Sequence, residues 1–407
     1  MMPTITVVGA GFSGLTTAYF LSKQNCKVQI IEKTDRPGGL IKTIRIPHGL
    51  VETAANGLLN SSRLEAMCRD IGVPLIPTRR EGRKRFIYRR KPKQVPLTLA
   101  DISQMALRFG VSAAKLRPRP FETIAGWGRR VLGRGATDYL LTPALGGIYA
   151  GDPERLSAGL IFGRAPLPGH LETNRPEKAR VRGTVAPPNG MQQLIEGLYD
   201  YLQNAGVEFH FQHDAQRIAG EPAVICLSAK GAADCLAQAA PQLSQALAGI
   251  EMLSLATVTC FYATEAAQLN GFGCLFPRDQ GFRARGVLFN DSIFSGRGPA
   301  HSETWIFGGA LDTDVVKLTD AEFGELIGCE RERFYGERDE PLDICITRWP
   351  QALPHYSVEL EKILKTLPAL PDNIALVGNY LGRIGLAKIL ERAAVVAESM
   401  VRTPPAW

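Results

Sequence analysis

The sequence of 407 residues lacks several patterns that would assign a protein to a common catalytic class. Its eight cysteines include no Cys-x-x-Cys pair and its six histidines are isolated, which argues against a zinc site or an iron–sulfur cluster. We therefore expect no metal site, and we expect the cysteines to be buried, reduced thiols of a cytoplasmic protein. No Gly-x-Ser-x-Gly elbow is present, so the sequence shows no serine nucleophile of that type.

Long apolar runs are missing as well. No stretch of eighteen or more residues is free of charged and polar breaks, so we expect no transmembrane helix. The chain enters a strand-like run at Thr4, so we expect no signal peptide. A hydrophobic content of 45% and a charged content of 21% are typical of a folded soluble protein, and the length is sufficient for two or three domains.

The first forty residues contain a pattern that predicts dinucleotide binding. A β-branched run over 4–8 leads into Gly9-x-Gly11-x-x-Gly14 and a helical stretch, and a second strand ends at Glu32. Gly9 allows the tight turn, Gly11 lets the backbone approach a pyrophosphate, and Gly14 lets the helix pack close to the strand. The helix N-terminus then favours the phosphates, and Glu32 accepts from ribose hydroxyls. The alternative is an ordinary βαβ turn, because glycine-rich turns are common.

A second glycine turn favours FAD over NAD. It spans residues 36–40 and is similar to the start of the glutathione-reductase-type FAD fold, in which this turn wraps the cofactor. A second Gly-x-Gly-x-x-Gly unit for a nicotinamide is absent, so we expect the electrons to leave to oxygen or another external acceptor. No cysteine follows Cys345, so a thioether from the C-terminal segment is not available and we expect non-covalent FAD.

Positive charge is concentrated in one segment of the chain. Residues 79–134 contain sixteen lysines and arginines but three acids. This segment either attracts a polycarboxylate substrate, adheres to an anionic membrane surface such as the inner face of the plasma membrane, or forms a solvated basic face. Apolar residues at helical spacing in the same region keep peripheral membrane attachment open. Nucleic-acid binding is not expected, because no pattern of stacking aromatics accompanies the charge.

Periodicity and turn residues predict the order of the elements. We expect a helix over 62–71 with Ser62 as its N-cap, a hairpin in 78–97, a helical pattern over 98–149, a small-residue loop over 142–153 and a helix over 192–204. Residues 250–350 predict an antiparallel sheet on the substrate side of a pocket. A strand over 373–377, a glycine loop and a final helix predict the last strand of the N-terminal sheet, with the helix N-terminus facing the flavin N1/C2 edge.

Several stretches together resemble the protoporphyrinogen oxidase family, within the wider monoamine oxidase-like superfamily. The resemblance runs nearly end to end and is carried by the first glycine turn with Glu32, RPGG at 36–39, RFIY at 85–88, GIYAGDPERLS at 147–157, GFGxLxP at 271–277, LPHY at 353–356 and GN at 378–379. It implies oxidation of a porphyrinogen, protoporphyrinogen IX or coproporphyrinogen III, to the porphyrin in haem biosynthesis. Hydride would pass to flavin N5, and oxygen or another acceptor would reoxidise the flavin.

The resemblance also implies the residues of the site. Arg85 would pair with a substrate carboxylate, Gly147 and Ala150 would line the macrocycle, and Phe272 and Leu275 would form an apolar wall. No catalytic residue is assigned, because the flavin carries the chemistry. The implied cofactor contacts are Gly9, Gly11, Phe12, Ser13, Gly14, Glu32, Lys33, Arg36, Gly38, Gly39, Leu40, Ala55, Asn56, Ala215, Trp349, Gly378, Asn379, Ile384, Gly385 and Leu386.

Three places depart from the family pattern. Gly146 stands where an arginine is common, and Gly382 precedes Arg383 where the family generally has the arginine first. Only about eight residues separate Ala215 from Ala223, where a hairpin usually lies.

The predicted fold class combines α/β with α+β: a glutathione-reductase-type FAD-binding fold, an antiparallel-sheet substrate domain and a small helical insert. The predicted domains are 1–77, 184–240 and 371–407 for FAD, 78–97, 151–183 and 241–370 for the substrate, and 98–150 for the basic, helical insert. Alternatives are another flavin oxidase or desaturase, a non-redox flavin isomerase of the sugar-nucleotide mutase type, and a catalytically silent partner protein. A contact with a haem-pathway enzyme or a homodimer is the expected protein interaction.

Overall fold

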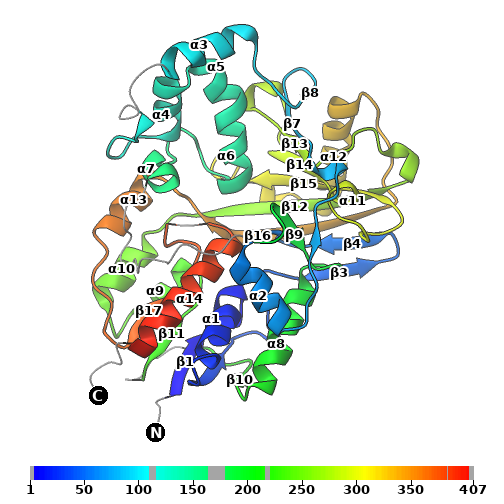
Figure 1. Ribbon diagram of the computed structural model, residues 1–407. Coiled ribbons are helices and arrows are strands. Elements are labelled where there is room, and N and C mark those ends of the chain that lie inside the picture. Colours follow the sequence, from blue (N-terminus) through cyan, green and yellow to red (C-terminus); the bar gives the residue numbers. More distant parts are fainter. Residues whose placement is uncertain (1–3, 110–115, 164–178, 216–220, 383, 403–407) are drawn as a thin grey trace.

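A five-stranded parallel sheet combines strands from the beginning, the middle and the end of the chain (Figure 1). The pairing of Ala223 with Ile374 confirms that 373–377 supplies the last strand of this sheet. In spatial order the strands are β10 (Glu208–His210), β2 (Lys27–Ile31), β1 (Thr4–Val8), β11 (Ala223–Ile225) and β17 (Ile374–Leu376). The computed structural model describes residues 4–109, 116–163, 179–215, 221–382 and 384–402.

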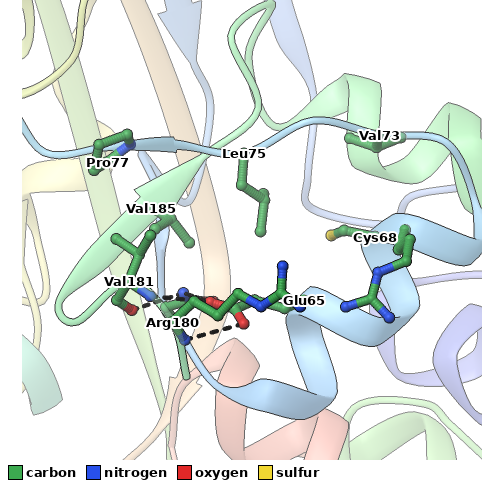
Figure 2. Close-up of a pocket in the computed structure, with 10 residues that line it drawn as sticks. Glu65, Cys68, Val73, Leu75, Pro77, Arg180, Val181 and Val185 are labelled. Atoms are coloured by element: carbon green, nitrogen blue, oxygen red, sulfur yellow. Dashed lines mark hydrogen bonds between the residues drawn. The ribbon is translucent and has the colours of Figure 1, made fainter. Parts of the chain in front are cut away.

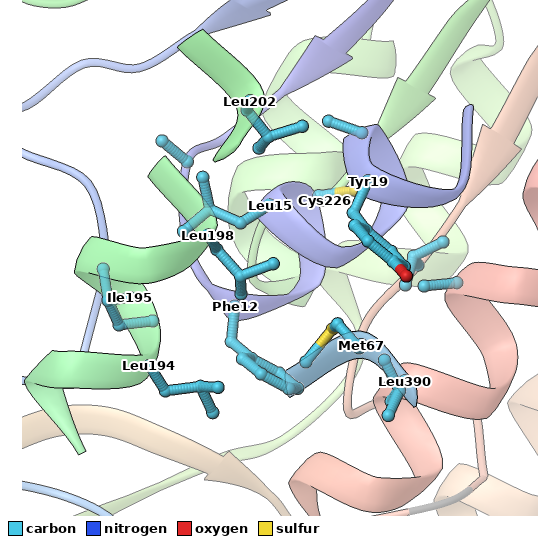
Figure 3. Packing of buried hydrophobic residues seen from close by; sticks show 14 of the residues in the cluster. Phe12, Leu15, Tyr19, Met67, Leu194, Ile195, Leu198, Leu202, Cys226 and Leu390 are labelled. Carbon is cyan, nitrogen blue, oxygen red and sulfur yellow. The ribbon is translucent and has the colours of Figure 1, made fainter. Parts of the chain in front are cut away.

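Both faces of this sheet are buried, as expected of parallel strands that are covered by helices. Val7 belongs to one apolar cluster and Val8, the next residue, belongs to a second. Figure 3 shows the first cluster, in which Leu15 of α1 lies with Leu198 of α8 and Leu390 of α14. The helices of the two clusters are α1 (Phe12–Ser22), α2 (Ser62–Asp70), α8 (Gln192–Asn204) and α14 (Leu386–Arg402) on one side, and α9 (Ala229–Leu236), α10 (Pro241–Ala248) and α13 (Val358–Lys365) on the other.

The second sheet has seven strands and includes the region predicted to carry the substrate side. All of its neighbouring strands are antiparallel except β13 and β7, which are parallel, so the predicted sheet is confirmed with one parallel pair. The hairpin expected in 78–97 is formed by β7 and β8. The strand order is β16 (Asp343–Pro354), β12 (Met252–Tyr262), β15 (His301–Gly308), β14 (Gly286–Phe289), β13 (Gly273–Leu275), β7 (Arg85–Tyr88) and β8 (Pro92–Lys93).

A helical insert lies beside one end of the second sheet (Figure 1). The interpretation of 142–153 as a loop is wrong, because its first eight residues form a helix with Pro143 in the first turn, where proline costs no intrahelical hydrogen bond. This helix ends at Tyr149, and its C-cap, Ala150, has a left-handed φ of +50°. The insert consists of α3 (Leu99–Phe109), α4 (Ile124–Val131), α5 (Arg134–Ala136), a π-helical turn (Thr137–Leu141) and α6 (Thr142–Tyr149).

Two further expectations need correction. Ser61, not Ser62, caps α2, because its side chain accepts from Leu64 N at 3.2 Å. Five cysteines are buried as expected, but Cys329 is exposed, and Cys26 and Cys345 are half-buried. The remaining elements are β3 (Thr43–Ile46) with β4 (Gly49–Glu52), β5 (Leu58–Leu59) with β9 (Thr184–Ala186) and β6 (Ile76–Pro77), and the helices α7 (Ala158–Phe162), α11 (Asn290–Ile293) and α12 (Asp320–Tyr335).

Within the part of the chain that the structure describes, every helix is too short or too polar to cross a membrane. The boundaries given above for the three domains stay a prediction.

Candidate functional site

The two glycine turns that were predicted to hold a cofactor are in contact with each other. Gly38 N donates to Ala10 O at 2.8 Å, and Gly11 forms a parallel bridge with Gly38. Gly9 has a φ of +99°, which residues with a Cβ rarely adopt. A Cβ on Gly14 would lie 1.8 Å from the Gly9 carbonyl oxygen, so α1 can pack this closely against the turn only with glycine at that position.

The N-terminus of α1 is open toward the second turn. Gly11 is its N-cap, no side chain caps the helix, and its first turn, which contains Phe12 and Ser13, has no acidic residue. A Cβ on Gly11 would meet Gly39 Cα at 3.9 Å and no closer atom, so there is room beside this backbone. The first N–H groups of a helix and its dipole attract anions. This arrangement fits the pyrophosphate of a dinucleotide.

Glu32 is held in place just after β2. Its carboxylate oxygens accept from Ala10 N at 2.7 Å and from Thr34 Oγ1 at 2.8 Å. Thr34 N also donates to the oxygen that Thr34 Oγ1 binds, at 2.9 Å, so the oxygen bound by Ala10 N is the one that keeps a lone pair for a ribose hydroxyl. Arg36 stabilises the second turn by donating to Gly39 O at 2.9 Å.

A distant strand joins the same region through one hydrogen bond. Trp349 of β16 donates from Nε1 to Thr53 O at 2.6 Å. Trp349 is thereby tied to the turn that contains Ala55 and Asn56, which are both half-buried. This bond places Trp349 beside the segment that contains the other two predicted cofactor residues.

The C-terminal glycine loop connects β17 to α14. Gly378 and Asn379 follow β17, and Gly378 is buried. Ile384 and Gly385 precede Leu386, the first residue of α14, and Gly385 has a φ of +98°. Since α14 packs against α1, the two ends of the chain meet beside the first glycine turn.

Four residues named from the sequence are not explained by the contacts of this region. Lys33 and Leu40 have exposed side chains. Ala215 accepts from Cys235 Sγ at 3.3 Å, and residues 216–220, where the hairpin was missing, lie outside the described residues. Arg383 lies outside them as well.

On the substrate side, β7 and β13 bring Arg85 and Phe272 together. Arg85 pairs with Gly273, and its guanidinium carbon lies 4.1 Å from the centre of the Phe272 ring. Arg85 is exposed to solvent, and desolvation of the part of its side chain that lies against the protein lowers its pKa below the usual value. No acid of the described chain forms an ion pair with this guanidinium, so its charge is available to a ligand.

The other predicted substrate residues meet where α6 packs on β13. A Cβ on Gly147 would lie 2.6 Å from Leu275 Cδ2, so the helix touches Leu275 through a residue without a side chain. Ala150 is buried at the end of α6, and its carbonyl accepts from Ala310 N at 2.9 Å. Phe272 precedes β13 and Leu275 is its last residue. One short strand therefore positions both the contact with Arg85 and the contact with Gly147.

The basic segment over 79–134 is only partly neutralised from within. Its exposed surface also includes Leu99 and Leu107 of α3, which are 86% and 81% exposed. These features are compatible with an anionic ligand or surface, and membrane attachment stays a prediction. Each acid of the segment lies within 3.6 Å of one of its arginines, in the pairs Arg79–Glu81, Arg89–Asp101 and Arg130–Glu122.

Two cavities are lined by none of the predicted site residues. One, of about 400 Å³, lies between α6 and the ends of β14 and β15, and Arg285 lines it. Sequence reasoning missed Arg285, and the available signal was a charged residue directly before the apolar run 286–289. The other, of about 280 Å³, lies between α2 and β9, where Glu65 accepts from the backbone of Arg180 and Val181 (Figure 2). Among the described residues, no cluster of His, Cys, Asp or Glu could hold a metal ion.

The chain is similar to known flavoproteins in both sequence and structure. The family model described as flavin containing amine oxidoreductase matches residues 12–383. The chain is 24% identical to the chloroplastic protoporphyrinogen oxidase of Nicotiana tabacum, over 97% of this chain and 84% of that protein. A solved structure from Exiguobacterium sp. 255-15, named putative protoporphyrinogen oxidase, superposes with a TM-score of 0.78 at 19% identity, covering 98% and 99% of the two chains. Reduced UDP-galactopyranose mutase superposes with a TM-score of 0.77 at 12% identity, covering 100% of this chain and 95% of that one.

Proposed function

The chain belongs to the flavin containing amine oxidoreductase family and is an FAD-dependent oxidoreductase, and from that premise we propose that it oxidises a porphyrinogen to the porphyrin. FAD, when bound, would supply the two-electron oxidation, with oxygen or another acceptor reoxidising it. The glycine turns fit this cofactor, because the room beside Gly11 at the start of α1 suits its pyrophosphate. Glu32, held by Ala10 N, would accept from its ribose.

The observation that carries the proposal is the placement of Arg85 on the Phe272 ring, beside the contact between Leu275 and Gly147. This wall combines an apolar surface with one unpaired positive charge. A porphyrinogen is a large apolar macrocycle with carboxylate side chains, so it matches both properties. Arg85 would bind a carboxylate in a bidentate pair and orient the macrocycle toward the flavin. The name of the tobacco relative supports this substrate class over other oxidase substrates.

The substrates of other enzymes with this fold fit the charge of Arg85 less well or in a different way. An amine substrate is cationic and would be repelled by Arg85, and an uncharged polyene has no carboxylate to offer this guanidinium. A sugar-nucleotide mutase reaction is the second candidate, because the fold also matches UDP-galactopyranose mutase and an arginine could bind a diphosphate. That reaction would leave the flavin without net oxidation.

One assay separates these functions. The purified yellow protein is mixed under air with protoporphyrinogen IX or coproporphyrinogen III, and porphyrin fluorescence and peroxide are followed. We expect porphyrin and peroxide to form together, faster than autoxidation. Parallel reactions contain a primary amine or UDP-galactopyranose with reduced flavin. Turnover of either one, without acceleration of porphyrin formation, would overturn the proposal.

A further inference from the structure

An arginine without an acidic partner lines the larger cavity. The cavity, of about 400 Å³, lies between α6, which contributes Thr142 and Gly146, and the ends of two strands, which contribute Arg285 and Gly308. Arg285 donates from Nε to the Gly308 carbonyl. Throughout the described residues, no carboxylate oxygen comes within ion-pair distance of this guanidinium. The two terminal nitrogens of Arg285 therefore keep their hydrogen atoms for another acceptor.

The other arginines of the cavity are already paired. Arg283 makes two hydrogen bonds to Asp312, at 2.8 and 3.0 Å. Arg278 lies 3.5 Å from Asp152. Arg285 is left as the uncompensated charge, and burial together with the Arg278 charge lowers the pKa of Arg285 to about 10. Arg285 is half-buried, so it loses part of its hydration without an ion pair in return, and an anion bound beside it would offset that loss.

Two glycines flank the Arg285 guanidinium: Gly146 leaves open space beside Nη1, whereas Nη2 packs against Gly309 where a Cβ would otherwise lie. A Cβ on Gly146 would lie 3.7 Å from Nη1 of Arg285, and a Cβ on Gly309 would lie 2.6 Å from Nη2. Two terminal nitrogens on one edge match the two oxygens of a carboxylate. We propose that this cavity is a carboxylate-binding site, in which Arg285 holds the ligand in a bidentate pair between α6 and the sheet.

The site is next to the substrate wall but distinct from Arg85. Gly147 of α6 touches Leu275, whereas the preceding residue, Gly146, faces Arg285. The helix α6 therefore lines both the substrate wall and the cavity. Arg85 lies at the other end of β13, opposite Gly273. The bound carboxylate is therefore either a second carboxylate of the substrate or that of a separate small acid.

The two sources can be told apart by the substrate. Coproporphyrinogen III has a carboxylate on every pyrrole ring, whereas protoporphyrinogen IX has carboxylates on only two adjacent rings. A substrate that reaches Arg85 and Arg285 together needs carboxylates on different edges of the macrocycle. The substrate arm of the test rests on the proposed function, but carboxylate binding by the cavity does not.

The test uses the flavin-loaded protein and two variants. Arg285→Gln removes the charge, and Gly146→Leu fills the cavity from a position where a Cβ fits without a clash. The control is Arg338→Gln, a surface arginine paired with Glu325 at 2.9 Å. The probe is sodium succinate, compared with sodium chloride at equal ionic strength. Binding is read by titration calorimetry and by the melting temperature.

We expect succinate to bind the wild type and Arg338→Gln, and to bind neither cavity variant, with flavin content unchanged in all four proteins. If the source is the substrate, Arg285→Gln raises the KM for coproporphyrinogen III by about tenfold and leaves that for protoporphyrinogen IX unchanged. Loss of succinate binding with both KM values unchanged supports a separate acid.

A wild type that binds no succinate and whose KM values do not respond to either cavity variant overturns the inference. If the wild type oxidises neither porphyrinogen, the proposed function fails, and the succinate measurement alone decides whether the site exists.

Discussion

The first glycine turn is held by contacts between backbone atoms, whereas Arg85 and Phe272 of the substrate wall meet through their side chains. The turn holds Gly14 against the carbonyl of Gly9, and both residues lie within one short stretch of sequence. The substrate wall instead places Arg85 on Phe272, which is far away in the chain. Backbone contacts of this kind tolerate almost no substitution, whereas side-chain contacts can change without loss of the fold. We therefore expect the cofactor region to respond to mutation in an all-or-none manner and the substrate wall to respond by degrees.

The largest effect is expected from Gly14→Ala. The added carbon would lie 1.8 Å from the Gly9 carbonyl oxygen, and both groups belong to backbone that cannot rotate away. We expect a loss of about 3 kcal/mol or more in unfolding free energy, with little bound flavin. Urea unfolding and the flavin absorbance per protein measure both.

Gly11→Ala is the matched control for this prediction. Its Cβ would approach Gly39 Cα at 3.9 Å, an ordinary contact, so the fold should be kept. The methyl group would occupy the room assigned to the pyrophosphate, so the flavin content should fall without a loss of solubility. Normal flavin content in both variants would mean that the cofactor does not lie at this turn.

The difference between the regions explains what the sequence could predict. The first glycine turn was predictable because its constraints lie between neighbours such as Gly9 and Gly14, and a local pattern records them. The contact of Arg85 with Phe272 depends on the parallel pairing of β7 with β13, which no local pattern records. The family resemblance was what assigned both Arg85 and Phe272 to the substrate site, and it did not predict a role for Arg285.

Tertiary packing also explains the wrong expectation for α6. Gly146 and Gly147 lower helix propensity, so a small-residue loop was a reasonable interpretation of 142–153. The glycines are instead what allows this helix to approach Leu275 and Arg285. The cap of α2 was misplaced by one residue, from Ser61 to Ser62, because adjacent serines give the same signal.

The second prediction concerns a buried histidine that stabilises the seven-stranded sheet. His301 is buried between Asp291 and Glu303, at 3.1 Å from each. Burial lowers the pKa of His301, but the hydrogen bonds to the two carboxylates outweigh it and raise the pKa to about 9. Because the folded pKa exceeds the unfolded value, this stabilisation is complete below about pH 6.5 and is lost as the pH rises through about 9.

We expect the wild type to exceed His301→Gln in unfolding free energy by roughly 2–3 kcal/mol at pH 6, and by much less at pH 10. Urea unfolding at a series of pH values measures the difference. Trp305 donates to Glu303 at 3.1 Å, so its fluorescence, measured in a protein whose other three tryptophans are replaced by phenylalanine, reports on the sheet, and flavin release reports on the cofactor region. If the difference in unfolding free energy between the wild type and His301→Gln stays constant from pH 6 to pH 10, the assigned charge of His301 is wrong.

The third prediction concerns Arg85. Arg85→Ala should raise the KM for a porphyrinogen by about 10- to 100-fold, because a charge-assisted hydrogen bond to the carboxylate is lost. The flavin content should stay normal, since Arg85 makes no contact with the glycine turns. The KM of Arg85→Lys should lie between those of the wild type and Arg85→Ala, because lysine keeps the charge but loses the planar contact with Phe272. Loss of flavin in Arg85→Ala would show that the arginine supports the fold and not the ligand.

The smallest effect is expected from Gly147→Ala, and it tests the boundary between the two regions. The added carbon would lie 2.6 Å from Leu275 Cδ2, but this atom ends a flexible side chain that can turn aside. Alanine also favours the helix by up to about 1 kcal/mol, so the melting temperature should not fall. The displaced Leu275 would narrow the macrocycle site and raise KM by less than about fivefold. Adding Leu275→Ala should restore the space and return KM toward the wild-type value, because the two side chains compete for one volume. If Gly147→Ala instead lowers the flavin content, then α6 belongs to the cofactor region, and the division between backbone and side-chain contacts must be drawn elsewhere.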